Sequence, residues 1–141
     1  MTPLPEVGEG LPELRKLVTQ EQINRYARAS GDFNPIHLDP EFAAGSSFGR
    51  TVAHGMLVLA FLSEMLTTAF GRAWLESGRL KVRFRSPVYP GEEVTSYGRV
   101  TRSEAQEEGH LLVCAVGCRN QKGEEVITGE ASLSQGVQGR G

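Results

Sequence analysis

Long hydrophobic runs and basic tracts are both missing from this sequence of 141 residues. The longest apolar run covers residues 55–62, far fewer than the roughly 20 residues that a membrane-spanning helix needs. The 15 basic and 17 acidic side chains give a net charge of −2, which offers no electrostatic footprint for nucleic acid. The first residues lack the basic and apolar segments of a signal peptide. We therefore expect a cytoplasmic protein with neither a membrane nor a nucleic acid as partner.

Cysteine is scarce as well, with only Cys114 and Cys118 in the chain. They lie in a segment with the pattern of a strand, which would place them on one face about 13 Å apart. That separation is too long for a disulfide, and a metal site would need further ligands nearby. We expect two small buried side chains and no bound metal.

Internal repeats and low-complexity segments are also absent from the sequence. Its 39% apolar and 23% charged residues are typical of one globular domain. Residues 1–10 are rich in proline, glycine and glutamate and predict a flexible lead-in, and residues 135–141 predict a frayed tail. The single folded domain is therefore expected to span residues 11–134.

Three helices are predicted in the first half of the chain. Thr19 and Gln22 form a capping box at the start of the first helix, which ends by Gly31. Residues 39–45 form a second, short helix with proline in its first turn. The third runs through residues 57–66 and is apolar nearly all round, which indicates a helix covered on every side by other structure.

The second half of the chain predicts strands. Apolar residues alternate with Lys81, Arg83 and Arg85, a period of two that leaves one face in water. The segments with a strand pattern are 11–18, at an edge of the sheet, followed by 80–85, 93–102, 110–120 and 125–133. Helices followed by an antiparallel meander indicate an α+β fold, in which the sheet curls around the apolar helix.

The segment from Ser30 to His37 carries the strongest functional signal. Gly31 loosens the backbone, and Pro35 removes a donor and pushes the preceding residue toward an extended conformation. A continuous helix is thereby excluded, so Asp32 and His37 lie on a turn where their side chains converge. A carboxylate and an imidazole directed at one point form a general acid/base pair, and such loops carry function more often than packing.

A purely structural interpretation of this segment stays open on these residues alone. Glycine, aspartate, asparagine and proline all favour turns. Asp32 would then satisfy backbone N–H groups, and His37 would be an ordinary half-buried histidine.

A wider comparison of motifs favours the functional interpretation. Residues 26–37, with Ala43 six residues on, resemble the signature of the MaoC-like (R)-specific enoyl-CoA hydratases. Residues 48–49 and 53–56 resemble the segment that opens the central helix of that family, and residues 83–92 resemble its first strand and turn. The similarity spans roughly residues 12–134. It implies a hot-dog fold, in which a curved antiparallel sheet wraps around one long helix.

The resemblance also implies an activity, the reversible syn hydration of trans-2-enoyl-CoA to (R)-3-hydroxyacyl-CoA. Asp32 and His37 would hold and activate the water and deliver the proton to C2. Gly55 would bind the thioester oxygen through its N–H group. The residues themselves support this role, because the first N–H groups of a helix are unpaired and the helix dipole is positive there. The alternative for Gly55 is that it merely permits the turn into the helix.

Several further residues acquire expected roles. Ser30, Gly31 and Asn34 are expected to support the catalytic turn. The resemblance places Ser63 and Leu66 beside the acyl pocket, with plain core packing as the alternative.

Two more sets of polar side chains lie outside the expected site. His54 is either a ligand or base of the site or, as we expect, a structural brace at the start of the helix. Arg83 and Arg85 either meet the phosphates of the carrier or form a solvated basic face, and we leave them out of the site.

The resemblance further implies no cofactor beyond the coenzyme A that is part of the substrate. It implies a homodimer, or pairing with a related hot-dog subunit. The same chemistry run as a dehydration of a 3-hydroxyacyl group on coenzyme A or acyl carrier protein is the nearest alternative. A non-catalytic module that binds acyl thioesters is a third, although a binder has no need of an acid and a base.

Overall fold

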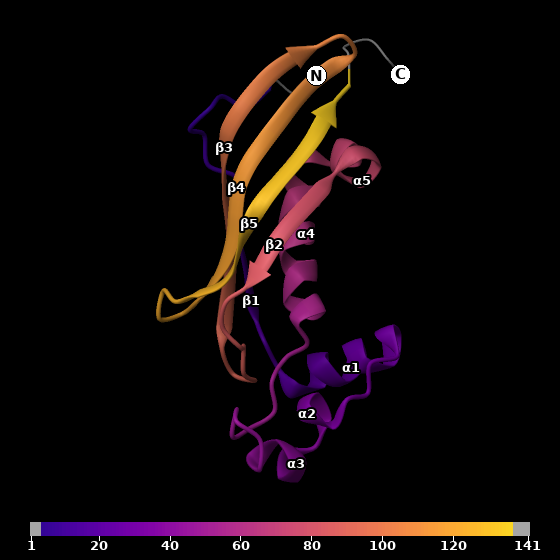
Figure 1. Cartoon of the computed structure of the whole chain (residues 1–141), viewed down its shortest axis with the longest axis vertical. Coiled ribbons are helices and arrows are strands. Elements are labelled where there is room, and N and C mark those ends of the chain that lie inside the picture. The colour runs from indigo at the N-terminus through magenta and orange to yellow at the C-terminus, as the bar shows by residue number, and fades with distance from the viewer. Residues whose placement is uncertain (1–3, 137–141) are drawn as a thin grey trace.

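The computed structural model describes residues 4–136, and they form an α+β fold, as predicted. One long helix lies against a curved antiparallel sheet (Figure 1). The elements in chain order are β1 Leu14–Leu17, α1 Gln20–Ser30, α2 Pro35–Leu38, α3 Pro40–Ala44, α4 Gly55–Phe70, α5 Arg72–Ser77, β2 Arg79–Phe84, β3 Glu93–Gln106, β4 Gly109–Asn120 and β5 Glu125–Gln135.

Helix α1 begins and ends as its sequence predicts. The Thr19 hydroxyl accepts a hydrogen bond from the backbone N–H of Gln22 at 3.1 Å, which satisfies one of the unpaired donors of the first turn. At the other end, Gly31 takes a left-handed conformation with φ 78° and donates its N–H to the carbonyl of Ala27. The chain therefore leaves α1 in a new direction immediately before Asp32.

Two short helices follow, and only the second was predicted. Helix α2 forms because the Asn34 side chain accepts from the N–H of Ile36 and Pro35 occupies the first helical position. Asp39 caps α3 in the same way. A helix of one turn, such as α2, shows no periodicity in the sequence, which is why it was missed.

Helix α4 is the apolar helix that the sequence predicts, extended to Phe70, but it is not covered on every side, because Met56, Ala60, Glu64 and Thr68 form an exposed face. Its side chains Leu62 and Leu66 are fully buried, and Phe61 is 5% exposed. The chain then turns at Gly71 into α5, which was not predicted. Trp74 of α5 packs into the same core and donates its indole N–H to the hydroxyl of Ser63 at 3.1 Å.

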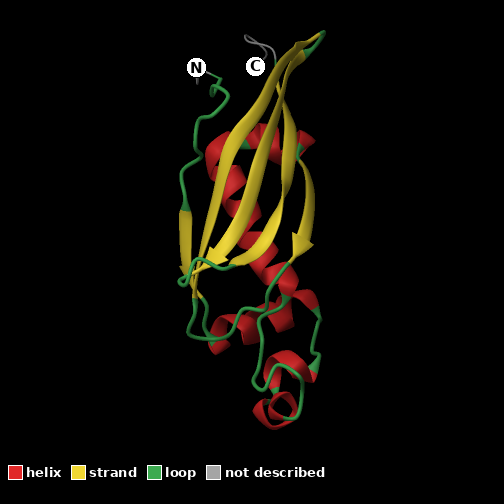
Figure 2. Cartoon of the chain, turned by 60° about the vertical axis from the view of Figure 1, so that its left-hand side comes forward, coloured by secondary structure: helices red, strands yellow, loops and turns green. Residues whose placement is uncertain are grey.

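The sheet has the strand order β1-β3-β4-β5-β2, with every pair antiparallel. Strand β1 is at one edge, as expected, and β2 at the other. Strands β3 to β5 are longer than the sequence pattern indicates, and a register shift follows Val100 in β3. Figure 2 shows the sheet bending over α4, which is the curled arrangement that we expected.

Contacts at both ends of the described chain lie outside the domain bounds that we expected. Gly8 donates to the carbonyl of Val100 and Leu11 to the carbonyl of Gly98, both at 2.8 Å. These residues therefore follow the edge of β3 instead of forming a loose lead-in. Gln135 is the last residue of β5, and residues 137–141, where most of the expected tail falls, lie outside the described part of the chain.

The fold places residues 30–37, which include Asp32 and His37, at one end of the molecule. Helices α1, α2 and α3 gather beyond the end of the sheet, next to the first turn of α4 (Figure 1). Across residues 4–136, every helix is too short or too polar to span a bilayer.

Both cysteines are free and buried in the core. Burial raises the pKa of the Cys114 thiol to about 11 and also raises the pKa of Cys118. At pH 8, about one Cys114 in a thousand is therefore a thiolate, the form that reacts.

We predict that a thiol reagent at pH 8 modifies the native protein at least 100-fold more slowly than the denatured protein. Rapid modification of both thiols in the native state would contradict this burial.

Candidate active site

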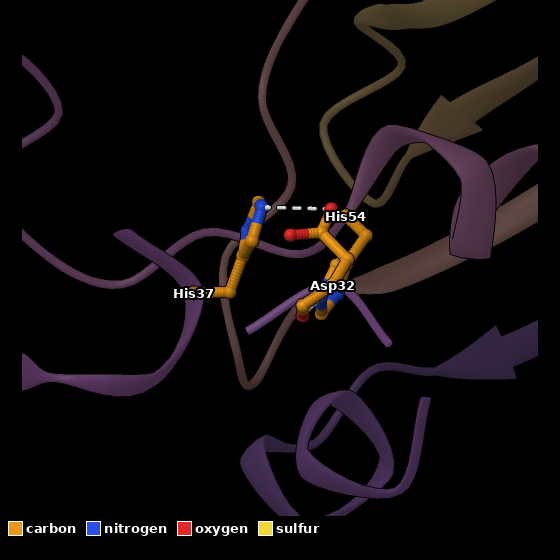
Figure 3. A group of neighbouring side chains, drawn as sticks. All are labelled: Asp32, His37 and His54. Atoms are coloured by element: carbon orange, nitrogen blue, oxygen red, sulfur yellow. Dashed lines mark hydrogen bonds and ion pairs between the residues drawn. The ribbon is translucent and has the colours of Figure 1, made fainter. Parts of the chain in front are cut away.

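Asp32 and His37 converge across the break between α1 and α2, as the sequence predicts. The Asp32 carboxylate accepts from the N–H of Asn34, and the Asp32 N–H donates to the Ser30 hydroxyl, each at 3.2 Å. These bonds fix the turn through Ser30 and Asn34. The Oδ2 atom of Asp32 lies 4.0 Å from Nε2 of His37, and Figure 3 shows the two groups facing one another.

The hydrogen bonds of His37 identify which ring nitrogen is free. Its Nδ1 lies 2.8 Å from the carbonyl oxygen of Val52. A carbonyl only accepts, so Nδ1 carries the hydrogen and donates it, and Nε2 keeps its lone pair. That lone pair is on the side of the Asp32 carboxylate. The imidazole is therefore prepared to take a proton from a group held between the two side chains.

Gln20 has a role that the sequence did not reveal. Its Nε2 donates to the carbonyl of His37 at 2.8 Å, and its Oε1 accepts from the Thr51 hydroxyl at 2.8 Å. The side chain thus links α1 to α2 and to the segment before α4. In the sequence, Gln20 is simply part of a helix start, because its partners are 17 and 31 residues away.

Gly55 is the first residue of α4 and is exposed. Its N–H has no acceptor within the helix, and the helix dipole adds positive potential at this end. A Cβ atom at this position would lie 3.0 Å from Cε1 of Phe84, so the exposed Phe84 ring would have to shift by a few tenths of an ångström to admit it. Glycine avoids this crowding and leaves the N–H open to a ligand oxygen.

A cleft of about 410 Å³ opens beside these groups. His37 and Gly55 are on its wall, and most of the remaining lining is apolar. The apolar residues are Ile36, Phe48, Val52, Ala53, Val58, Phe84, Pro87, Val88 and Val126, and the polar ones include Arg85 and Ser86. The cleft suits an apolar chain that ends in a polar reactive group.

Ser63 and Leu66, which are expected beside the acyl pocket, do not line this cleft. Leu66 is fully buried in the core, and Ser63 is hydrogen-bonded to Trp74 of α5. Ser63 follows Gly55 by eight residues, which is about 12 Å along a helix. In their place, Val58 of α4, Phe84 of β2 and Val126 of β5 form the apolar wall. Sequence patterns did not identify these three residues, because they converge from separate elements.

His54 is buried, with 2% of its surface exposed, and lies within the site. Its Nε2 is 3.0 Å from the backbone carbonyl of Asp32. Its ring stacks on that of His37, with centroids 3.9 Å apart and planes at 24°. The expected brace at the start of the helix therefore also contacts both catalytic candidates.

The group Asp32, His37 and His54 has the composition of a metal site, since one potential ligand atom of each lies within 4.8 Å of the others. Two nearly parallel stacked rings direct their in-plane lone pairs side by side instead of toward one ion. The Nε2 of His54 is also already paired with the carbonyl of Asp32. This geometry favours acid–base chemistry over metal binding.

The sequence profile of the MaoC like domain matches residues 6–118. The chain belongs to this family. It is 35% identical to the (R)-specific enoyl-CoA hydratase of Aeromonas caviae over 127 residues, covering 89% of this chain and 92% of that protein. It is 34% identical to the mitochondrial 3-hydroxyacyl-[acyl-carrier-protein] dehydratase of Arabidopsis thaliana over 128 residues, covering 90% and 75% of the two chains.

The MaoC-like fold is confirmed by solved structures as well. A structure of the (R)-hydratase from A. caviae involved in PHA biosynthesis superposes with a TM-score of 0.78 at 30% identity, over 92% of this chain and 96% of that one. The hot-dog fold that the sequence predicts is therefore correct. This MaoC-like chain is a lyase of the hydratase and dehydratase kind.

We predict that the MaoC-like chain needs no divalent metal. Incubation with excess EDTA followed by desalting should leave turnover unchanged, because the lone pairs of the stacked histidines do not converge on one ion. Loss of activity that returns on addition of Zn²⁺ or Mg²⁺ would contradict this prediction.

Proposed function

We propose that this chain is an (R)-specific enoyl-CoA hydratase that adds water reversibly to trans-2-enoyl-CoA. The observation that carries the proposal is the shared geometry of three groups. The Asp32 carboxylate and the free Nε2 of His37 face one another, and the N–H of Gly55 opens onto the cleft that His37 lines. Each group corresponds to one requirement of the reaction.

The acid–base pair accounts for the water and its protons. At 4.0 Å, the Asp32 and His37 atoms are too far apart for a direct hydrogen bond, but both can contact one water oxygen between them. The pair removes a proton from this water as its oxygen forms a bond to C3. A proton from the pair then forms the new bond at C2. Both additions come from the same side, so the addition is syn, and in the proposed reaction the pair meets the face of the double bond that gives the (R)-3-hydroxyacyl thioester.

The start of α4 accounts for the charge on the thioester. As water attacks C3, electrons move from the C2–C3 double bond toward the thioester oxygen, which gains enolate character. The N–H of Gly55 donates to this oxygen, and the helix dipole favours negative charge there. The acyl chain then follows the apolar wall formed by Val58, Phe84 and Val126.

The nearest alternative is the reverse reaction, the dehydration of a 3-hydroxyacyl group on coenzyme A or acyl carrier protein. The same three groups serve both directions, because a reversible reaction passes through one transition state. The A. thaliana relative is named as a dehydratase of acyl-carrier-protein substrates. A non-catalytic module that binds acyl thioesters is disfavoured, since the pair and its fixed tautomer have no purpose in simple binding.

We also propose that the chain acts as a homodimer. Three large apolar side chains near the site are exposed to solvent, namely Phe33 at 58%, Met56 at 58% and Phe84 at 54%. Strand β2 forms an edge of the sheet, and exposed edges invite pairing with another strand. A second copy would cover these side chains and narrow the mouth of the cleft. Pairing with a related hot-dog subunit would cover them equally.

The proposal is tested with crotonyl-CoA, by loss of absorbance at the enoyl thioester band and chiral analysis of the product. The parent protein should consume the substrate without an added cofactor and give the (R) alcohol. Asp32→Asn and His37→Ala should each lower kcat by about 10²–10⁴-fold, the usual contribution of general acid–base catalysis.

Two matched variants control for nonspecific effects of charge removal. Glu41→Gln removes an exposed carboxylate in the first turn of α3, and His110→Gln changes a histidine in β4. Both should retain the parent rate. Full activity in Asp32→Asn and His37→Ala would show that the site assignment is wrong, whereas inactivity of the parent on every enoyl-CoA would favour a carrier-protein substrate.

The proposed dimer is measured by sedimentation equilibrium. The expected mass is twice the 15.3 kDa of one chain, and Phe84→Glu should shift the equilibrium toward the single chain by placing a charge in the apolar contact. A parent protein that sediments as one chain at micromolar concentration would contradict the homodimer.

A further inference from the structure

His54 occupies a position that a capping side chain normally takes. It directly precedes α4, where Ser, Thr, Asp or Asn usually accepts a hydrogen bond from the first turn. The His54 side chain makes no such bond. Its ring is instead buried beside the segment that carries Asp32, so its contacts there require another explanation (Figure 3).

The hydrogen bond of His54 identifies its tautomer. Nε2 lies 3.0 Å from the carbonyl oxygen of Asp32, and because a carbonyl only accepts, Nε2 carries the hydrogen. Nδ1 is then an unprotonated acceptor. It is buried, and it has no hydrogen-bond partner among the described residues. Both observations fit a neutral ring.

The faces of the His54 ring are in contact with aromatic neighbours from two other elements. The imidazole of His37, from α2, stacks on it at 3.9 Å. The ring of Tyr26, from α1, is tilted against it at 4.8 Å and 60°. With its plane restrained by His54 and its Nδ1 held by Val52, the His37 ring has a fixed orientation.

We propose that His54 is a positioning residue that holds the three catalytic groups in one geometry, an inference whose catalytic consequence depends on the proposed function. Its Nε2 holds the backbone of Asp32, its face holds the ring of His37, and its own peptide bond leads to the N–H of Gly55. No other described side chain contacts both Asp32 and His37 while adjoining Gly55 in the chain.

The neutral state of His54 is part of this role. The titratable groups around it are Asp32, His37 and Tyr26. A positive charge on His54 would oppose the protonation of His37 across the stack and would attract the Asp32 carboxylate away from the water. The Nε2–H tautomer avoids both effects and still provides the donor that the Asp32 carbonyl needs.

A first test uses the unmodified protein and needs no turnover. Long-range ¹H–¹⁵N NMR spectra should show His54 as the Nε2–H tautomer. The Nδ1–H tautomer would overturn the proposal.

A second test separates the two contacts of the ring. His54→Phe keeps an aromatic face for His37 but loses the donor to Asp32, and His54→Gln keeps a donor but loses the face. Both variants should lower kcat by about 10–100-fold, since small misplacements of catalytic groups have effects of this size. KM should stay within about threefold, because the cleft residues are unchanged. His110→Gln is the matched control and should keep the parent kcat.

The outcomes distinguish this inference from the proposed function. A purely structural role would lower Tm while folded enzyme kept its kcat, and that result, or a parent kcat in both variants, would overturn the inference. If the parent protein turned over no enoyl thioester, the proposed function would fail. The tautomer of His54 would then still decide whether its contacts are as described.

Discussion

The packing of α4 is the constraint on which the rest of the structure depends. Its apolar side chains pack against the sheet and α5, whereas Met56, Ala60, Glu64 and Thr68 form a face exposed to solvent. Its first turn lies at the end of the molecule where α1, α2 and α3 gather (Figure 1). The unpaired N–H groups of that turn are therefore available at the place where α1 and α2 deliver a carboxylate and an imidazole. Hydrophobic burial fixes the position of the helix, and the position of the helix fixes the site.

Much of this architecture could be predicted from the sequence, because its signals are local. Thr19 caps a helix through a residue three positions later, Gly31 ends it through its own backbone freedom, and alternation identifies β2. The convergence of Asp32 and His37 was predictable for the same reason, since a helix break and a proline lie between them. The short helices α2 and α5 were missed, because elements of four to six residues carry no clear periodicity. Helix α4 and the long strands also extend beyond the segments where their sequence patterns are clearest.

The contacts that complete the site join residues far apart in the chain, and sequence patterns could not reveal them. Gln20 reaches the carbonyl of His37, and Val52 accepts from the ring of the same histidine. Ser63 and Leu66, expected beside the acyl pocket, lie away from the described cleft, because helical spacing identifies a face of α4 but not which part of that face the sheet and α5 cover. Val58, one turn from the start of α4, is where the cleft meets the helix.

The lining of the cleft combines parts of the chain that lie far apart in sequence. Asp32, His37 and Gly55 belong to residues 32–55, whereas part of the apolar wall, Phe84 of β2 and Val126 of β5, is encoded about 30 to 70 residues later. Substitutions in those strands can lengthen, shorten or narrow the cleft without moving Asp32, His37 or the N–H of Gly55, which on the proposed function are the acid–base pair and the amide donor. Substrate range can therefore drift through mutation while the chemical step is preserved, and the same division gives an engineer a set of positions for changing chain-length preference.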